Sequence, residues 1–455
     1  MNTFKTINPA TEDVIAEYDI MPKEEVLSIA EQCDLAFRQW KVMDISTRAS
    51  YLKRLAQILR HNKDKYAKLM TLEMGKPIKQ SLTEVEKCAW TAEVYADNGA
   101  KWLEDEIVTA DGKKHFVSFE PIGTILSIMP WNFPFWQAFR IAIPTLLAGN
   151  TSVLKHSNAV PQCALAIEES FREAGFPDNV FRSVISDHET IAHLIKSDII
   201  QGISLTGSTY AGARIAELAG KHLKKVVLEL GGSDPFIVLD DADVEFAAEN
   251  AVIGRTRNSG QSCIAAKRFI VDKKIAKEFS EIFSSHMAKL KVDDPMLMET
   301  DVGPLVNEDQ VEQIEEQVND AVKKGAKVLT GGKRLDRKGF FYMPTVLTDV
   351  KNSMKVAKEE VFGPVAPIII ANDYKEAVEI ANSSEYGLGA SIWTKDESKA
   401  LKISRNIEAG CVFINSVVKS DPRMPFGGVK KSGIGRELSK YGLKEFVNVK
   451  GINVY

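Results

Sequence analysis

One cysteine in a loop of small residues is the first candidate for chemistry in this chain. Cys263 ends the run NSGQSC at residues 258–263, in which small and turn-forming residues let the backbone approach a ligand closely. A thiolate presented in this way can act as a nucleophile. A buried, unreactive cysteine is the more common fate of this residue type, so the loop alone does not decide between the two interpretations.

Two further groups could assist this thiol. Glu229 stands near the end of the strand-like run 225–230, where its carboxylate could act as a general base on water. Asn132 stands in PWNFP at residues 130–134, whose two prolines restrict the backbone and so direct the amide, as stabilisation of an oxyanion requires. Each residue taken singly is more simply explained as a solvated strand-end glutamate or as part of a structural proline-rich turn.

A nucleotide site is indicated only weakly by local motifs. The usual GxGxxG fingerprint is missing, and the nearest run, at residues 433–438, lacks a third glycine. The run ISLTGST at residues 203–209 instead leads from a strand into a helix, whose first N–H groups could bind a phosphate close to Gly207. An ordinary strand-to-helix turn is the alternative.

Metal ligation is not supported. His188 and His193 lie too far apart around a helix to match the zinc motif with spacing i, i+4. The five cysteines are scattered and never form a CxxC pair, which favours reduced thiols in a reducing compartment over a disulfide framework or a zinc site. We therefore expect no metal site. The cysteines are Cys33, Cys88, Cys163, Cys263 and Cys411.

Length and composition limit the class of protein. The 455 residues predict two or three domains, and the fractions of 44% hydrophobic and 26% charged residues are typical of a globular chain with a large core. The 58 basic and 62 acidic residues give a net charge of −4, which argues against nucleic acid or an anionic membrane as a partner. The first residues show no secretory signal, so we expect a cytoplasmic protein.

The elements that must position these groups follow from periodicity. Helical spacing over Lys23–Trp40 and on through 45–74 predicts that the chain opens with long helices. Strand-like runs on either side of Asp111-Gly112 predict a projecting hairpin, with which the run Phe446–Tyr455 could pair. Between these, strands and helices alternate in two series that meet near the glycine pair 231–232, which predicts two α/β units.

Together, these motifs resemble the aldehyde dehydrogenase superfamily over nearly the whole chain, in order and at matching separations. The family's proline-flanked asparagine falls on Asn132, its base on Glu229 and its nucleophile on Cys263, and its Glu-Glu-x-Phe-Gly-Pro motif falls on residues 359–364. The resemblance implies two Rossmann-like α/β domains plus a β-hairpin oligomerisation arm. It also implies that Cys263 attacks an aldehyde, that Asn132 stabilises the oxyanion and that Glu229 activates the hydrolytic water.

By the same resemblance, the chain divides into three parts and forms a homodimer or homotetramer. Residues 1–103 and 120–231 would form the dinucleotide-binding domain, residues 232–430 the catalytic domain, and residues 104–119 and 431–455 the arm.

The resemblance further implies a binding site for NAD or NADP. Many members that prefer NAD carry a glutamate where this chain has Asn158, and its absence predicts that NADP is accepted and even preferred. The cofactor-binding residues implied are Trp131, Lys155, Ser157, Asn158, Gly207, Ser208, Glu360 and Phe362.

Three more positions look like the carboxylate-binding residues of short bacterial-type succinate-semialdehyde dehydrogenases. They are Arg140, Arg257 and Ser420, and guanidinium groups suit a carboxylate because they can bind it through two parallel hydrogen bonds. Oxidation of succinate semialdehyde to succinate is therefore the expected activity. The alternatives are another small aldehyde such as glutarate semialdehyde, a cysteine hydrolase, or a binding protein on the same fold.

Overall fold

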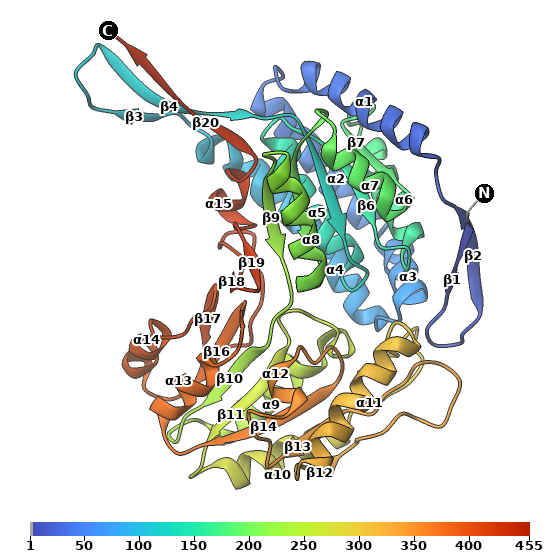
Figure 1. Cartoon of the computed structure of the whole chain (residues 1–455), viewed down its shortest axis with the longest axis vertical. Helices are drawn as coiled ribbons and strands as arrows, with labels where there is room; N and C mark the ends of the chain where they lie inside the picture. The colour runs from blue at the N-terminus through green and yellow to red at the C-terminus, as the bar shows by residue number, and fades with distance from the viewer. Residues whose placement is uncertain (1–2) are drawn as a thin grey trace.

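The computed structural model describes residues 3–455, in which buried runs of Val, Ile and Leu form two mainly parallel sheets, each in its own lobe (Figure 1). The six-stranded sheet of the first lobe has the order β19-β9-β8-β5-β6-β7, with only β19 antiparallel to its neighbour. Its strands are β5 (Thr124–Met129), β6 (Thr151–His156), β7 (Phe181–Val184), β8 (Ile200–Thr206), β9 (Lys225–Glu229) and β19 (Gly433–Ile434).

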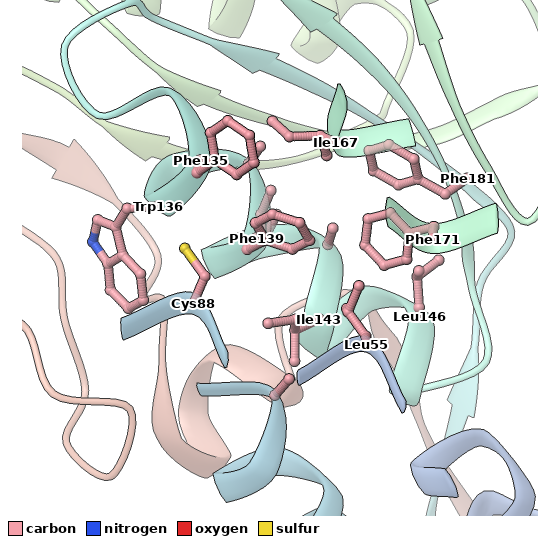
Figure 2. Packing of buried hydrophobic residues seen from close by; sticks show 14 of the residues in the cluster. Leu55, Cys88, Phe135, Trp136, Phe139, Ile143, Leu146, Ile167, Phe171 and Phe181 are labelled. Atoms are coloured by element: carbon pink, nitrogen blue, oxygen red, sulfur yellow. The ribbon is translucent and has the colours of Figure 1, made fainter. Parts of the chain in front are cut away.

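Helices cover both faces of this sheet, as parallel strands require. Successive residues of β5, Ile125 and Leu126, belong to two different hydrophobic clusters, because neighbouring side chains of a strand point to opposite faces. Figure 2 shows the larger cluster, in which aromatic residues of α5 such as Phe139 pack beside Phe171 of α6. The helices of this lobe are α1 (Lys23–Trp40), α2 (Ile45–His61), α3 (Lys63–Met74), α4 (Ile78–Trp102), α5 (Pro134–Leu147), α6 (Pro161–Glu173), α7 (His188–Lys196) and α8 (Thr209–Lys221).

The second lobe contains a seven-stranded sheet with the order β12-β13-β14-β11-β10-β16-β17. Its strands are β10 (Asp234–Val238), β11 (Ala266–Asp272), β12 (Lys327–Thr330), β13 (Thr345–Thr348), β14 (Val365–Ala371), β16 (Gly389–Trp393) and β17 (Cys411–Ile414). Its helices are α9 (Val244–Thr256), the 3-10 turn η1 (Arg257–Gly260), α10 (Ala276–Ala288), α11 (Glu308–Lys323), α12 (Lys355–Lys358), α13 (Tyr374–Asn382) and α14 (Glu397–Ser404). Strands β9 and β10 lie on either side of the glycine pair 231–232.

The predicted hairpin is confirmed and projects from the body (Figure 1). Strand β3 (Glu106–Val108) pairs with β4 (Lys114–Pro121), and β20 (Val447–Val454) pairs with the other edge of β4, as expected for the C-terminal run. The short helix α15 (Ser439–Leu443) leads into β20, and β15 (Tyr386–Gly387) pairs with β18 (Val429–Lys430).

The expectation that the chain opens with helices was wrong. The chain opens with the antiparallel hairpin β1 (Thr3–Ile7) and β2 (Val14–Asp19), and the helical stretch 45–74 is broken at Asn62 into α2 and α3. No helix within residues 3–455 is long and apolar enough to cross a membrane.

Candidate active site

The loop that carries Cys263 connects α9 to β11 and has an unusual backbone. Asn258, Ser259 and Gly260 have φ values of 53°, 55° and 77°, a left-handed conformation that L side chains rarely adopt. Only glycine fits at position 260, because a Cβ there would clash with the carbonyl group of Gly363. The turn leaves the Cys263 side chain partly exposed while the residues before it are buried.

Asn132 belongs to the loop between β5 and α5 and contacts the Cys263 loop directly. Its Nδ2 donates to the carbonyl of Gln261 at 3.1 Å, and its Oδ1 accepts from Nε2 of Gln137 at 3.0 Å. Asn258 Nδ2 donates to the Asn132 carbonyl at 2.7 Å. These bonds fix the amide beside the thiol loop and leave the second hydrogen of Nδ2 for an oxyanion.

Glu229 is the last residue of β9, and its carboxyl group is buried. The residue is only 2% exposed, and neither carboxyl oxygen has a hydrogen-bond partner among residues 3–455. Burial raises the pKa of Glu229 well above its usual range, Glu437 raises it further, and Arg140 opposes both effects. In this arrangement the charged form of the carboxyl group is disfavoured, and no hydrogen bond holds the group in place.

The surroundings of Cys263 likewise disfavour the charged form of its thiol. Burial raises the pKa of Cys263 to about 12, although Arg140 and Lys267 both lower it. The charges of Glu360 and Glu229 raise it further, which places both carboxylates within electrostatic range of the sulfur. The four predicted groups nearest the chemistry, Asn132, Glu229, Cys263 and Glu360, therefore gather at one point between the lobes.

Lys267 is a fully buried site residue that the sequence reasoning missed. Its Nζ donates to the carbonyls of Ser262 at 2.8 Å and Cys263 at 2.6 Å, and it pairs with Glu360 Oε1 at 3.3 Å. The lysine thus ties the thiol loop to the Glu-Glu-x-Phe-Gly-Pro segment. The sequence did contain a signal for it, namely a lysine at the start of the apolar strand β11. A buried lysine needs partners, so its position indicates a polar contact inside the protein.

The predicted cofactor residues of the first lobe lie at the carboxyl ends of neighbouring strands. Trp131 follows β5, Lys155 lies near the end of β6, and Gly207 and Ser208 follow β8. Strand β5 stands where the sheet order reverses direction, which is where open α/β sheets bind ligands. Ser208 caps α8 by accepting the N–H of Ala211 at 3.2 Å, so the helix N-terminus faces this edge.

The second lobe contributes its predicted cofactor residues to the same region. Glu360 accepts the N–H of Gly232 at 3.1 Å, and the ring of Phe362 meets that of Trp131 edge to face at 5.7 Å. On the first lobe, Lys155 Nζ lies 3.4 Å from Oδ1 of Asn158, while the N–H of Ser157 donates to the carbonyl of Met129. This region therefore offers hydrogen-bond donors and one helix N-terminus, and it has no carboxylate at position 158. Such surroundings suit a phosphorylated dinucleotide.

Two of the three predicted carboxylate-binding residues have partners that the sequence did not indicate. Arg140 of α5 is buried, forms an ion pair with Glu437, and donates to Oγ1 of Thr206 at 3.2 Å. Ser420 accepts a hydrogen bond from Nζ of Lys87, a residue of α4, at 2.6 Å.

Arg257 differs, because it has no hydrogen bond or ion pair from its side chain to any residue in the range 3–455. Both Arg140 and Arg257 lower the pKa of Lys87, so both guanidinium groups lie within electrostatic range of the ammonium group that contacts Ser420. We call these four residues the cationic cluster.

Comparison with known proteins decides the family. The profile described as "Aldehyde dehydrogenase family" matches residues 1–452. The chain belongs to the aldehyde dehydrogenase family. The resemblance stated from the motifs is thereby confirmed.

The sequences of known relatives match this aldehyde dehydrogenase over nearly its whole length. It is 47% identical over 447 residues to a probable succinate-semialdehyde dehydrogenase (NADP(+)) of Synechocystis sp., with 98% of each chain covered. It is 43% identical over 447 residues to a succinate semialdehyde dehydrogenase (NAD(P)+) of Escherichia coli, covering 98% of this chain and 97% of the relative.

Solved structures confirm the predicted fold class. The succinic semialdehyde dehydrogenase of Streptococcus pyogenes, solved with NADP+ as the cofactor, matches with a TM-score of 0.97 and 37% identity, and 99% of each chain is covered. The architecture of an aldehyde dehydrogenase with two α/β halves, expected from the motifs, is therefore correct.

Proposed function

We propose that this aldehyde dehydrogenase oxidises succinate semialdehyde to succinate with NADP, and with NAD less efficiently. The observation that carries the substrate is the cationic cluster, in which Lys87 contacts the Ser420 hydroxyl and is influenced by both arginines, and Arg140 is close enough to the thiol to lower its pKa. A semialdehyde places its carbonyl at Cys263 and its carboxylate in this cluster, whereas an uncharged aldehyde leaves the cluster without a counter-charge. The names of the relatives support the same substrate and cofactor.

The residues have distinct roles in this reaction. The Cys263 thiol gives its proton to solvent water and its sulfur forms a bond to the aldehyde carbon, while Asn132 Nδ2 and the Cys263 backbone N–H stabilise the negative oxygen. The dinucleotide, when bound, supplies the acceptor for the two electrons of the oxidation. Glu229 then takes a proton from a water molecule, which attacks the thioester carbon and releases the carboxylate from sulfur. Because no hydrogen bond restrains the Glu229 carboxyl group, its side chain can turn toward that water.

The fit of the dinucleotide rests on residues of this chain. The N-terminus of α8 and the N–H groups of Gly207 and Ser208 would hold the pyrophosphate, and Lys155 with Ser157 would hold the adenosine ribose. Glu360 would hold the nicotinamide ribose beside Phe362 and Trp131. Lys155 and Asn158 would together accept a 2′-phosphate, because neither contributes a negative charge.

The substitution Asn158→Glu should shift the enzyme toward NAD. The new carboxylate would stand beside Lys155, neutralise it and repel a 2′-phosphate, so the ratio of kcat/KM for NADP to that for NAD should fall roughly ten- to a hundredfold. Steady-state kinetics with both cofactors measure it, and Asn158→Gln is the neutral control of the same size. An unchanged ratio in Asn158→Glu would show that position 158 does not contact the 2′-phosphate.

The substitution Arg257→Ala should impair the semialdehyde selectively. A charged hydrogen bond contributes about 1.5–3 kcal/mol, so kcat/KM for succinate semialdehyde should fall roughly 10- to 150-fold. Butyraldehyde, which has no carboxylate, should lose far less. Arg405→Ala removes an exposed arginine of the same lobe and serves as the control. Equal losses for both aldehydes would mean that Arg257 supports the thiol loop and does not bind the substrate.

Substitutions of Ser420 and Arg140 test the same contact with the substrate's carboxylate, but their effects are weaker or are combined with a loss of stability. Ser420→Ala should have a weaker effect in the same direction, because one neutral hydroxyl is lost. Arg140→Ala should also destabilise the protein by about 3–5 kcal/mol, because it leaves the buried Glu437 carboxylate without its partner. Kinetics with succinate semialdehyde, glutarate semialdehyde and butyraldehyde complete the test of the substrate.

We infer further that the domain division holds as predicted and that the arm assembles the enzyme as a homodimer or homotetramer in the cytoplasm. Apolar side chains on the arm support the assembly, since Ile107, Val449 and Tyr455 are 73%, 60% and 73% exposed. Free cysteines support a reducing compartment.

A further inference from the structure

Lys87 is the one member of the cationic cluster that no sequence motif indicated. It lies on α4, one residue before the buried Cys88, and its Nζ is 2.6 Å from Ser420 Oγ. The same ammonium group stands over the indole ring of Trp136, 4.1 Å from the ring centre. Figure 2 shows Cys88 of α4 and Trp136 of α5 in the buried hydrophobic cluster. These two contacts hold the ammonium group of Lys87 between the Ser420 hydroxyl and the Trp136 ring.

The carboxylates nearest to Lys87 already have other partners. Glu84, one turn earlier on α4, forms a buried ion pair with Lys76 and accepts the N–H groups of Phe135 and Trp136. Asp421 pairs with Arg423, whose Nη2 lies 2.7 Å from its Oδ2. Lys87 makes no ion pair with either of them.

The other charged groups around Lys87 are positive. Arg140 faces it from α5 and Arg257 from η1, and both act with burial to lower the pKa of Lys87 to about 7. Cys88 and Glu84 on its own helix raise that pKa by smaller amounts. Arg140 has Glu437 as a counter-charge, but Lys87 and Arg257 have none among residues 3–455. A negative group that entered this space would stabilise the protonated lysine.

We propose that Lys87 binds the carboxylate of the substrate together with Arg257 and Ser420, and that its protonation makes the enzyme's preference for a semialdehyde depend on pH. The inference rests on the proposed function, because it assigns a third cation to the site for that carboxylate. Lys87 is a substrate-binding residue in this scheme and takes no part in the chemistry at Cys263.

The direction of the pH effect follows from the charge. The substrate's carboxylate is ionised above about pH 6, and it binds the ammonium form of Lys87 but not the neutral amine. Binding raises the pKa of Lys87, so the complex takes up a proton when the free lysine is neutral. Selectivity for the semialdehyde should thus be highest well below pH 7 and decline as the pH rises through the pKa of the free lysine.

The ratio of kcat/KM for succinate semialdehyde to that for butyraldehyde isolates this effect. Titration of Cys263 and Glu229 affects both aldehydes alike and cancels in the ratio. In the wild-type enzyme the ratio should fall roughly tenfold between about pH 6 and pH 8.5. Lys87→Met should give a low ratio that does not change with pH, since methionine keeps the apolar stem without the charge.

Two further variants complete the experiment. Lys87→Arg should give a high ratio across the whole range, because a guanidinium group stays protonated. Lys101→Met, an exposed lysine in the last turn of the same helix, should keep the wild-type profile.

The outcomes separate this inference from the proposed function. A fall of the ratio with pH that persists in Lys87→Met or Lys87→Arg would assign the titration to another group, such as Glu437, and overturn the inference. So would a wild-type ratio that is high but constant with pH. A wild-type ratio below one at every pH would instead overturn succinate semialdehyde as the substrate.

Discussion

Cys263→Ala should abolish aldehyde oxidation, with a loss of at least about 10⁴-fold in kcat. The thiol forms the covalent bond to the substrate, and no other group in the loop can replace it. Binding of NADP should change little, because the predicted cofactor residues lie on other segments, at the ends of β5, β6 and β8 and around Glu360. The absorbance of the reduced cofactor measures turnover, and the quenching of protein fluorescence by NADP measures binding.

Cys411→Ala is the matched control for this experiment. Cys411 is a partly buried cysteine of β17, and its sulfur donates a weak hydrogen bond to the carbonyl of Leu388 at 3.6 Å. Its removal should leave turnover near the wild-type value. Measurable oxidation by Cys263→Ala, with the control active, would show that the nucleophile is elsewhere.

Glu229→Gln should separate the two halves of the reaction. The first half requires only the thiol and the oxyanion donors, so a burst of about one reduced cofactor per site should appear at nearly the normal rate. Hydrolysis of the thioester should then be slower by roughly 10²–10⁴-fold, because water has lost its base. Stopped-flow absorbance records both phases.

The buried position of Glu229 also predicts the stability of this variant. Its pKa is raised in the folded protein, so the ionised form is disfavoured there, and stability is lost as the pH rises above the unfolded-state value. Glutamine is neutral and of the same shape, and the variant should be at least as stable as the wild type at pH 7 in thermal unfolding.

Glu397→Gln, on the exposed first turn of α14, should match the wild type in kinetics and stability. A uniformly slow first turnover in Glu229→Gln would assign Glu229 to activation of the thiol and not to hydrolysis.

Local sequence patterns predicted most of the fold and the residues of the motifs. The helix Lys23–Trp40 has the predicted bounds, because helical periodicity acts over short distances. The hairpin β1–β2 was missed because its strands are short, and most of their residues are at least partly exposed, so they lack a clear apolar face.

Partnerships between distant residues could not be predicted in the same way. The ion pair of Arg140 with Glu437, the bonds of Lys267 to the thiol loop, and the contact of Lys87 with Ser420 each depend on how the segments pack. A motif predicts which residue type stands at a position. It does not predict the partner of that residue, because the partner comes from a distant part of the chain at no fixed spacing from the motif. The roles of the predicted site residues stay predictions until the variants are measured.

The position of β19 has a consequence for the newly made chain. The nascent polypeptide emerges with its N-terminus first, so β9 is complete long before Gly433 and Ile434 exist to cover its edge. Until then β9 presents unpaired N–H and C=O groups, the kind of edge to which another chain can add. Arg140 also lacks its ion-pair partner until Glu437, in the same late segment, has been synthesised. A chain that ends before residue 433 would therefore contain Cys263 and Glu229 but be prone to aggregate, because residues 433–437 both supply the partner of Arg140 and cover the edge of the sheet.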